Sequence, residues 1–360
     1  MTWCTGLALA GLLAGCGQPA AVRTVGSSGR EIGSWGRVIE VPGLGSLSTG
    51  KHGYARVNAV SCASAGNCAA GGHYRGQRAI QQGFVAVERN GLWGTATGVP
   101  GLAALNQGGY AGVLTVSCAS AGRCAAGGYY ADADSHDTYG FVVSEENGGW
   151  GKAVTFPAGG DGEVDSISCA SAGNCLAGGA ASANYTSSDH GFVAEERNGR
   201  WGKAIAVPGL AALGAGGEAY VNSVSCGSAG NCAAGGLYTD RHGDEQGFVA
   251  VERNGAWGRA IAVPGLAALS KGGETEVSSV SCASAGSCVA GGDYQGSHGL
   301  RGFVAAERNG RWSTATGVPG LAALNKGGGQ TMVLSVSCAP AGSCVAGGSD
   351  GNHSNQGFVT

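Results

Sequence analysis

Apolar and polar residues alternate in short segments along this chain, and glycine-rich turns separate the segments. Residues 221–226 and 232–238 alternate on either side of a short turn, and residues 247–255 run directly into residues 256–265. Alternation with a period of two is typical of strands with one buried face. Asn254-Gly255 joins the last two segments, and Asn-Gly between apolar runs is a strong hairpin signal because a type I′ turn needs two residues with positive φ. The pattern predicts a meander of four antiparallel strands.

This four-strand unit recurs six times with a period near 56 residues. Because each repeat has four strands and no helical pattern, the array predicts an all-β fold, a six-bladed β-propeller of four-stranded antiparallel blades. A β-solenoid-like repeat array is the alternative fold, although solenoid rungs are usually shorter. The repeat cores lie near residues 57–94, 113–151, 164–202, 221–258, 277–312 and 333–360.

The two ends of the array predict how the ring closes. The sequence ends at residues 357–360, within the third strand of the sixth repeat, whereas residues 35–43 supply a fourth strand ahead of the first repeat. Placed together, these segments complete the last blade. If the sequence instead stops short at Thr360, the same architecture is less tightly closed.

Each repeat contains two cysteines with five residues between them. We expect each pair to flank a hairpin loop, which brings the two Cα atoms to about 5 Å and within reach of a disulfide. Zinc ligation by thiolates is the alternative, but structural zinc sites usually have about two to four residues between cysteines and need four converging ligands. The expected disulfides are Cys62–Cys68, Cys118–Cys124, Cys169–Cys175, Cys226–Cys232, Cys282–Cys288 and Cys338–Cys344.

Composition supports a folded β-protein and narrows its partners. With 72 glycines, 43% apolar residues and 12% charged residues, the chain is too apolar to be disordered and too poor in Leu, Lys and Glu for a helical solenoid. Its net charge is -3 and its isoelectric point is about 6.2, with no run of Lys or Arg. A nucleic-acid-binding protein would carry a clustered basic surface, so we expect no nucleic-acid partner.

The first residues have the pattern of an export signal. An apolar stretch at residues 7–13 is followed by small residues, and it is too short to span a membrane. Residues 13–16, Leu-Ala-Gly-Cys, resemble the lipobox of bacterial lipoproteins. This resemblance implies that Cys16 is acylated and becomes the first mature residue.

Export agrees with the cysteines, because disulfides persist only where thiols are not kept reduced. The expected organisation is a signal peptide at residues 1–15, a lipid anchor and flexible linker at residues 16–32, and the propeller at residues 33–360. We expect the protein on the extracellular face of the cell membrane, held there by its lipid anchor. Ordinary secretion is the alternative.

Residues that recur in the repeats are expected to belong to the scaffold. Tryptophans such as Trp257 open the fourth strand and phenylalanines such as Phe248 open the third, and we expect both to pack blade against blade, with sugar stacking as the alternative. Paired glycines of the second strand, such as Gly235-Gly236, predict a bulge or a close backbone approach. Glutamates such as Glu252, just before the tight turn, are expected to be solvated hairpin ends.

The segment between the second and third strands differs in every repeat, as functional loops on rigid scaffolds usually do. These segments share one face with the linkers between blades, so we expect the ligand-binding face there. A ring of imidazoles near loop aspartates would suit a metal ion or a pH sensor, but the registers of the loops differ and we expect no metal or cofactor. The candidate ligand-binding residues are His73, Tyr74, His136, His190, His242, His298 and His353.

Across residues 35–360, repeats with the pattern VSCASAGNCAAGG followed by GFVAVERNG resemble those of an uncharacterised actinobacterial family of exported proteins and lipoproteins with propeller-like Cys-x5-Cys repeats. The resemblance implies the fold and export. It brings no activity and no catalytic residue with it.

These observations predict a monomeric, non-catalytic extracellular propeller that binds a glycan or protein ligand through its variable loops and touches the membrane only through the lipid anchor. The alternative is an exported hydrolase or lyase that acts on glycans at the axial mouth of the ring. Its candidate residues break the repeat, since a catalytic site is not copied around a ring; they are Asp161, Asp165, His136 and Tyr185. A purely structural role in the envelope is a third hypothesis.

Overall fold

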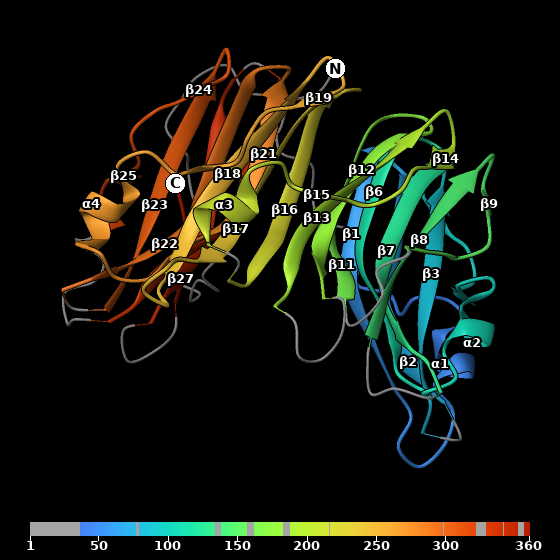
Figure 1. Ribbon diagram of the computed structural model, residues 1–360. Coiled ribbons are helices and arrows are strands. Elements are labelled where there is room, and N and C mark those ends of the chain that lie inside the picture. Colours follow the sequence, from blue (N-terminus) through green and yellow to red (C-terminus); the bar gives the residue numbers. More distant parts are fainter. Residues whose placement is uncertain are drawn as a thin grey trace, which may run out of the picture. The chain divides into compact units, whose positions relative to one another are not determined.

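The protein is described by a computed structural model (Figure 1), which covers residues 37–76, 79–133, 138–156, 162–182, 188–215, 217–297, 299–321, 329–340, 342–351 and 356–360. The expected signal peptide, linker and lipidation site at Cys16 lie outside the described residues. Residues Glu40–Thr360 form one compact unit. Within the described ranges, no helix is both long and apolar enough to cross a membrane.

The compact unit consists of six antiparallel sheets, one for each repeat, which we call blades 1 to 6 (Figure 1). Consecutive blades lie side by side through their first strands. The prediction of an all-β, six-bladed β-propeller is confirmed.

The long strands have the following bounds. Blade 1 contains β1 (Tyr54–Ser64), β2 (Asn67–Arg75) and β3 (Gln81–Arg89), and blade 2 contains β6 (Ala111–Ser120), β7 (Arg123–Ala131) and β8 (Thr138–Glu146). Blade 3 contains β11 (Gly162–Ser171), β12 (Asn174–Ala181) and β13 (His190–Arg197), and blade 4 contains β16 (Ala219–Ser228), β17 (Asn231–Thr239) and β18 (Glu245–Arg253). Blade 5 contains β21 (Thr275–Ser284), β22 (Ser287–Gly296) and β23 (Gly299–Arg308), and blade 6 contains β26 (Thr331–Cys338), β27 (Cys344–Asp350) and β28 (Gln356–Val359).

The fourth strand of blades 1 to 5 is split into two short pieces that both pair with the third strand. In blade 4 the strand leaves the sheet between the pieces because the Ala260 N–H donates to Pro208 O, in the linker before the blade, at 2.7 Å. The predicted continuous strand at residues 256–265 is therefore wrong in its middle. The pieces are β4 (Leu92–Trp93), β5 (Thr97–Gly98), β9 (Gly149–Trp150), β10 (Val154–Thr155), β14 (Arg200–Trp201), β15 (Ile205–Ala206), β19 (Ala256–Trp257), β20 (Ile261–Ala262), β24 (Arg311–Trp312) and β25 (Thr316–Gly317).

The linkers between blades contain one-turn helices that the sequence pattern did not predict. They follow a Pro-Gly pair in which the glycine adopts positive φ, as Gly209 does at 81°. Four residues are too few to show helical periodicity, so the pattern gave no signal. The helices are α1 (Leu44–Leu47), α2 (Leu102–Leu105), α3 (Leu210–Leu213) and α4 (Leu266–Ser270).

All six expected disulfides are present, each between directly paired residues of the first and second strands. In blade 4, Cys226 pairs with Cys232 and Ser228 with Asn231, with a register shift between them. The connection is therefore a two-residue turn with a bulge rather than the expected open five-residue loop. The two Cα atoms lie 4.0 Å apart, closer than the expected distance.

The paired glycines show both a bulge and a close backbone approach, the two features that the sequence predicted as alternatives. The first strand of blade 4 has a register shift between Val221 and Ser223, opposite Gly235-Gly236. A Cβ on Gly236 would lie 1.9 Å from Tyr220 O, and a Cβ on Gly235 would lie 2.6 Å from Val277 Cγ1 of blade 5. The first glycine therefore lets the next blade approach, and the second lets the two strands of its own hairpin approach.

The recurring glutamates are buried in blades 2 to 5, so the expectation of solvated hairpin ends is wrong for them. Glu307 is 1% exposed, and Arg253 of the preceding blade reaches it with Nη2 at 2.9 Å from Oε1. A buried carboxylate needs a partner of this kind because leaving it unpaired is costly. The partner belongs to another repeat, which the pattern within one repeat could not show.

A ladder of hydroxyl groups links each blade to the next. Side-chain oxygens on one first strand accept hydrogen bonds from backbone N–H groups of the following first strand, at 2.9 to 3.1 Å. Ser223 accepts from Val280 and Ser225 from Cys282, for example. The ladder has a direction, since the earlier blade always accepts.

The predicted closing strand is not observed in the described residues. The sheet of blade 6 comprises β26, β27 and β28, and residues 37–40 carry no strand. The equivalent pieces in other blades are two residues long, so few hydrogen bonds would hold such a strand. The Pro42 carbonyl does accept the Ala96 N–H at 2.7 Å, just as Pro208 accepts the N–H of Ala260. The end of the segment therefore contacts blade 1 in the way that the later linkers contact their following blades. Closure by residues 35–39 stays a prediction.

Candidate functional site

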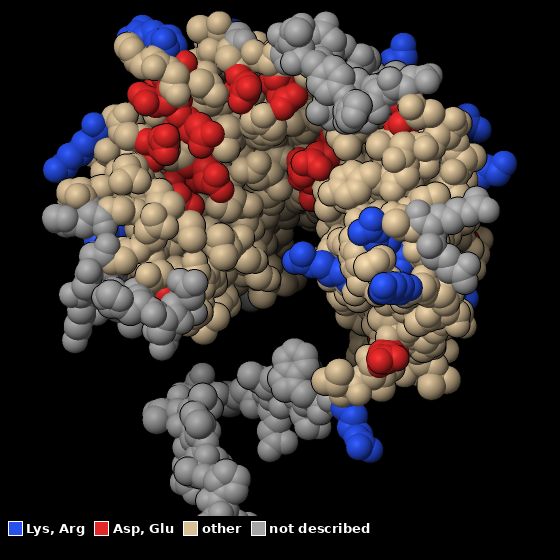
Figure 2. Space-filling model, turned by 90° about the horizontal axis from the view of Figure 1, so that it is seen from below, with Lys and Arg blue, Asp and Glu red and all other residues tan. Residues whose placement is uncertain are grey.

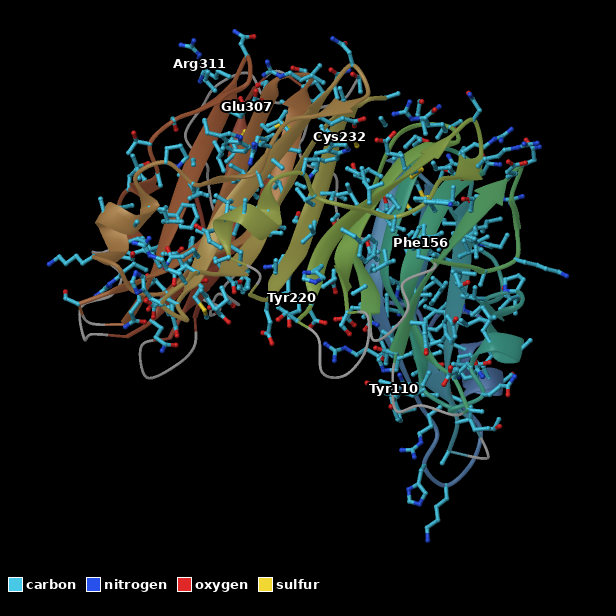
Figure 3. All side chains as sticks on the ribbon, viewed as in Figure 1. Tyr110, Phe156, Tyr220, Cys232, Glu307 and Arg311 are labelled. Atoms are coloured by element: carbon cyan, nitrogen blue, oxygen red, sulfur yellow. A yellow bond between two sulfur atoms is a disulfide. The ribbon has the colours of Figure 1, made fainter. Side chains whose placement is uncertain are left out.

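The variable segments and the linkers between blades meet at one end of the long strands, which we call the loop face. The Gln81 N–H, at the start of β3, donates to Gly109 O in the linker before β6 at 2.9 Å. Figure 3 places Tyr110 and Tyr220 at this end and Cys232 and Glu307 at the other. The expected shared face is therefore present, and it carries side chains from both the variable segments and the linkers.

The described histidines of the loop face lie on different blades. His73 on β2 is half-buried, with Nδ1 3.2 Å from Asn58 Nδ2 and its ring edge-on to Tyr54. Burial lowers the pKa of His73, and the charge of Arg56 lowers it further. His190 begins β13 and His242 lies in the turn after β17, both exposed. Within the described ranges no three metal-ligating side chains are arranged so that they could hold a metal ion.

Tyr74 packs into its own blade. Its ring lies against the core cluster that contains Phe84, Ala86 and Ala96, and burial raises the pKa of its hydroxyl. This packing gives Tyr74 a structural role, while its role in ligand binding stays a prediction. The other candidate residues His136, His298, His353, Asp161 and Tyr185 lie outside the described residues.

Asp165 is the one candidate acid of the axial mouth that the structure describes. It lies in the bulge of β11 between Val164 and Ser166, where the other five repeats have Asn, Leu or Ser. Burial raises the pKa of Asp165 to about 8, and the charge of Glu163 contributes to the shift. A carboxyl group with a raised pKa next to a second carboxyl group is an arrangement that acid–base catalysis uses.

A cluster of five carboxyl groups lies on the loop face of blades 4 and 5, and we call it the acidic cluster. Figure 2 shows acidic side chains gathered on this side of the protein. In the described part of the chain, no Lys or Arg forms an ion pair with any of the five. Its members are Glu218, Glu245, Glu274, Glu276 and Asp293.

Asp293 is the most buried member of the acidic cluster. It lies directly opposite Glu276 across the β21–β22 pair, so both side chains are on the same side of the sheet, and it is 8% exposed. The pKa of Asp293 is raised to about 7, mainly by burial and in part by the charges of Glu276 and Glu245. Burial also raises the pKa of Glu245, helped by Glu274, Glu276 and Glu218. Like charges without a counter-ion make this a place where a cation would bind favourably.

Tyrosines lie beside the acids on the loop face. The Tyr220 hydroxyl donates to Asp189 Oδ2 at 2.6 Å, and the ring of Tyr110 packs at a tilt against that of Tyr129, with ring centroids 4.9 Å apart. Tyr110 is 51% exposed, so its ring is available to a ligand. Sequence reasoning looked at the segments before the third strand and missed these residues and the acidic cluster. The available signal was the pair of linkers GGEAY and GGETE, which place glutamates before the first strands of blades 4 and 5.

No protein-family model and no curated protein matches this chain. Solved structures with a similar fold include a protein of unknown function from Dyadobacter fermentans, with 12% identity, a TM-score of 0.45, and coverage of 87% of this chain and 95% of that one. YCF48 from Cyanidioschyzon merolae has 13% identity, a TM-score of 0.44, and coverage of 82% and 78%. An α-L-arabinofuranosidase from Fusarium graminearum has 10% identity, a TM-score of 0.45, and coverage of 84% and 92%. At these levels the likeness concerns the fold and says nothing of a ligand.

Proposed function

We propose that this protein is a non-catalytic binding propeller of the cell exterior, held there through Cys16, which captures a ligand with positively charged groups on its loop face. The observation that carries the proposal is the acidic cluster, in which five carboxyl groups have no basic partner among the described residues. Six disulfides fit a protein that works in an oxidising environment. The ligand is a glycan with free amines or a protein segment rich in Lys and Arg.

Charge recognition makes the binding test specific. We expect the purified protein to retain chitosan oligosaccharides or a lysine-rich peptide on an array and to retain N-acetylated chitin oligosaccharides much less, because acetylation removes the charge. Binding should weaken with added salt, since exposed charges are screened. The double variant Glu276→Gln and Asp293→Asn should lose most of the binding. Glu88→Gln, which removes a carboxyl group at the opposite end of the strands, serves as the matched control.

A second function, hydrolysis or lyase cleavage of a glycan, is favoured by Asp165, because a carboxyl group with a raised pKa suits a proton donor and Glu163 places a second carboxyl group beside it. Mass spectrometry of the oligosaccharides after incubation separates the two functions. Intact ligand supports the binding function, whereas products that disappear in Asp165→Asn support the enzyme. If no cationic ligand binds, or if binding is the same in the double variant, the acidic cluster is not the site.

A further inference from the structure

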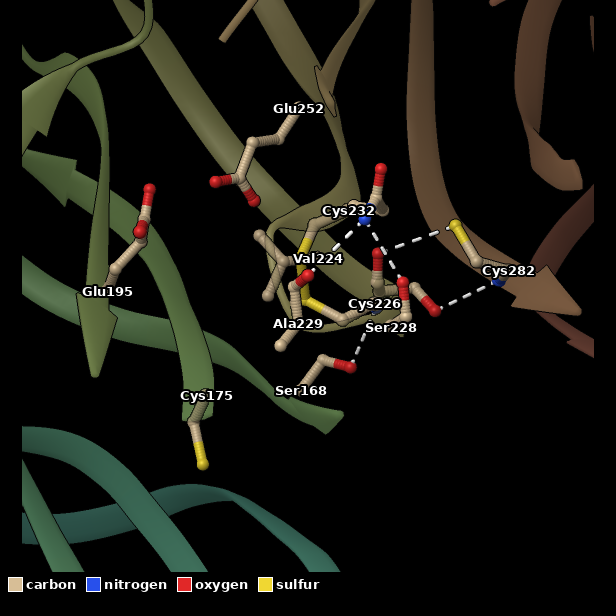
Figure 4. Close-up of a disulfide and its surroundings, with 12 residues drawn as sticks. Ser168, Cys175, Glu195, Val224, Cys226, Ser228, Ala229, Cys232, Glu252 and Cys282 are labelled. Carbon is tan, nitrogen blue, oxygen red and sulfur yellow. Dashed lines mark hydrogen bonds between the residues drawn. A yellow bond between two sulfur atoms is a disulfide. The ribbon is translucent and has the colours of Figure 1, made fainter. Parts of the chain in front are cut away.

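A cavity lies at the end of the strands opposite the loop face, between blades 3 and 4. Its volume is about 280 Å³, and its lining includes Glu195 and Arg197 of β13, Glu252 of β18 and the Cys226–Cys232 disulfide. Figure 4 shows Glu195 and Glu252 on strands of neighbouring blades, near this disulfide. The equivalent space between blades 2 and 3 measures only about 10 Å³. The cavity between blades 3 and 4 is therefore larger than its equivalent between blades 2 and 3.

A residue that breaks the repeat lines this cavity. Glu195 occupies the position that holds valine in blades 1 and 4, Val87 and Val251. Arg197 forms an ion pair with Glu195 on its own strand, and its Nη2 stays 3.8 Å from Glu252 Oε1. The equivalent arginines of blades 1 and 4 approach their glutamates at 3.3 Å and 2.9 Å. Glu195 thus draws the arginine away from the buried carboxyl group of the next blade.

Glu252 is left with an unused acceptor that lines the cavity. The residue is 1% exposed, and among the described residues no donor is within hydrogen-bonding distance of Oε1. The Trp257 indole N–H donates to Glu195 Oε1 at 3.3 Å, and Arg197 pairs with the other oxygen, Oε2. Two carboxylates and one guanidinium leave one negative charge uncompensated. The pKa of Glu252 is raised to about 7, mainly by burial and in part by the neighbouring Glu195, so a proton takes up this charge near neutral pH.

We propose that the cavity binds a small ligand through a primary ammonium group placed between Glu195 and Glu252. An ammonium group has three N–H donors and supplies the positive charge that the two carboxylates lack. A hydroxyl group could donate to Glu252 but would leave the charge uncompensated. A metal ion is disfavoured, since no three metal-ligating side chains converge in the described ranges. The volume is just below the usual range for drug-sized ligands, which suits a single amino sugar or a short amine.

Saturation-transfer NMR with D-glucosamine and D-glucose tests the proposal, because the two sugars differ in one amine. We expect the full protein to bind glucosamine and to bind glucose far more weakly. Glu195→Val restores the residue that blades 1 and 4 carry, and we expect it to fold and to lose affinity for glucosamine by about thirtyfold or more. A thermal melt confirms that the variant is folded.

The Asp293→Asn variant separates this cavity from the acidic cluster of the loop face. Glucosamine binding that survives in Asp293→Asn and fails in Glu195→Val supports the cavity and is independent of the proposed function. The opposite pattern assigns the amine to the loop face and overturns the proposal. Equal binding of both sugars, or no binding of glucosamine at millimolar concentration, also overturns it.

Discussion

A few acidic residues are enclosed in the otherwise apolar interior of this scaffold. Most of its interior is small and apolar, as Ala234 and Val249 are, with 0% exposure each. Against this background Asp165, Glu252 and Asp293 hold carboxyl groups whose pKa values are raised to about 8, 7 and 7. Raised pKa values in partly enclosed sites point to function more often than to stability. Each of these groups should therefore reduce the stability of the folded protein at neutral pH.

Asp293 allows a direct test of this effect on stability. Its pKa is about 7 in the folded protein and 3.8 in an unperturbed carboxyl group. Between these values the folded protein retains a proton that the unfolded chain releases, so stability falls as the pH rises through this window and stays low above it. The variant Asp293→Asn cannot ionise at this position, so it does not lose stability in this way as the pH rises. We expect the variant to be more stable than the parent at pH 8, on the order of 1 kcal/mol, and equally stable at pH 4.

Urea unfolding of both proteins at pH 4 and pH 8 measures the difference, and a parent protein that is as stable as the variant at pH 8 contradicts it. The same substitution removes a carboxyl group from the acidic cluster. Stability and binding should therefore change in opposite directions, as expected where a site keeps an unfavourable charge for its ligand.

At the scale of the element, the disulfide hairpin is the unit that each repeat builds. The type I′ turn at Asn254-Gly255, with φ of 49° and 78°, follows from the sequence because its residue requirements are local. The cysteine pairs and the glycine pairs were predictable for the same reason. Each depends on contacts within one hairpin or on the same position of the next repeat.

Contacts between unlike positions were not predictable from one repeat. The fourth strand is interrupted because Ala260 bonds to a linker, and the buried Glu145 and Glu307 each pair with an arginine of the preceding blade. The cavity beside Glu195 depends on which of two carboxyl groups an arginine prefers. A residue that breaks the repeat can mark a contact of this kind in the sequence. The change in packing that the residue causes is seen only in the structure.

Gly236→Ala tests the hairpin. The added Cβ would lie 1.9 Å from Tyr220 O, which belongs to the backbone and cannot move aside without disturbing the strand pair. We expect a loss of stability of about 2 kcal/mol or more, the size typical of overpacking. Gly45→Ala is the matched control, because its Cβ would have nothing within 4 Å. Equal thermal stability of the two variants would count against the close approach.

At the scale of the whole molecule, six blades are each fastened by a local bridge and joined to their neighbours by non-covalent contacts. Each bridge spans a sequence separation of 6 residues and should stabilise its hairpin by about 2 kcal/mol. The number of blades, their strand order and the face that carries the variable loops followed from the repeat. The distribution of acids over that face did not, because charge placement varies from blade to blade.

Reduction tests the contribution of the bridges to the whole chain. Thiol titration of the denatured, unreduced protein should detect none of the twelve repeat cysteines. Incubation with dithiothreitol should expose all twelve and lower the melting temperature, because the unfolded chain gains freedom in six loops. Twelve reactive thiols before reduction would refute the pairing, and an unchanged melting temperature after it would refute the stabilising role.

The directional hydroxyl ladder bears on how such a gene can change over generations. In the described residues, blades 2 to 5 offer acceptors such as Ser223 and Ser225 to the blade after them and donors to the blade before them. Duplicating a stretch of DNA that encodes one full period would therefore insert a blade whose two new borders already match. An insertion of half a period would leave hydroxyl groups facing the wrong strand. Selection on this lineage should accordingly tolerate changes of length in steps of about 56 residues, the repeat period.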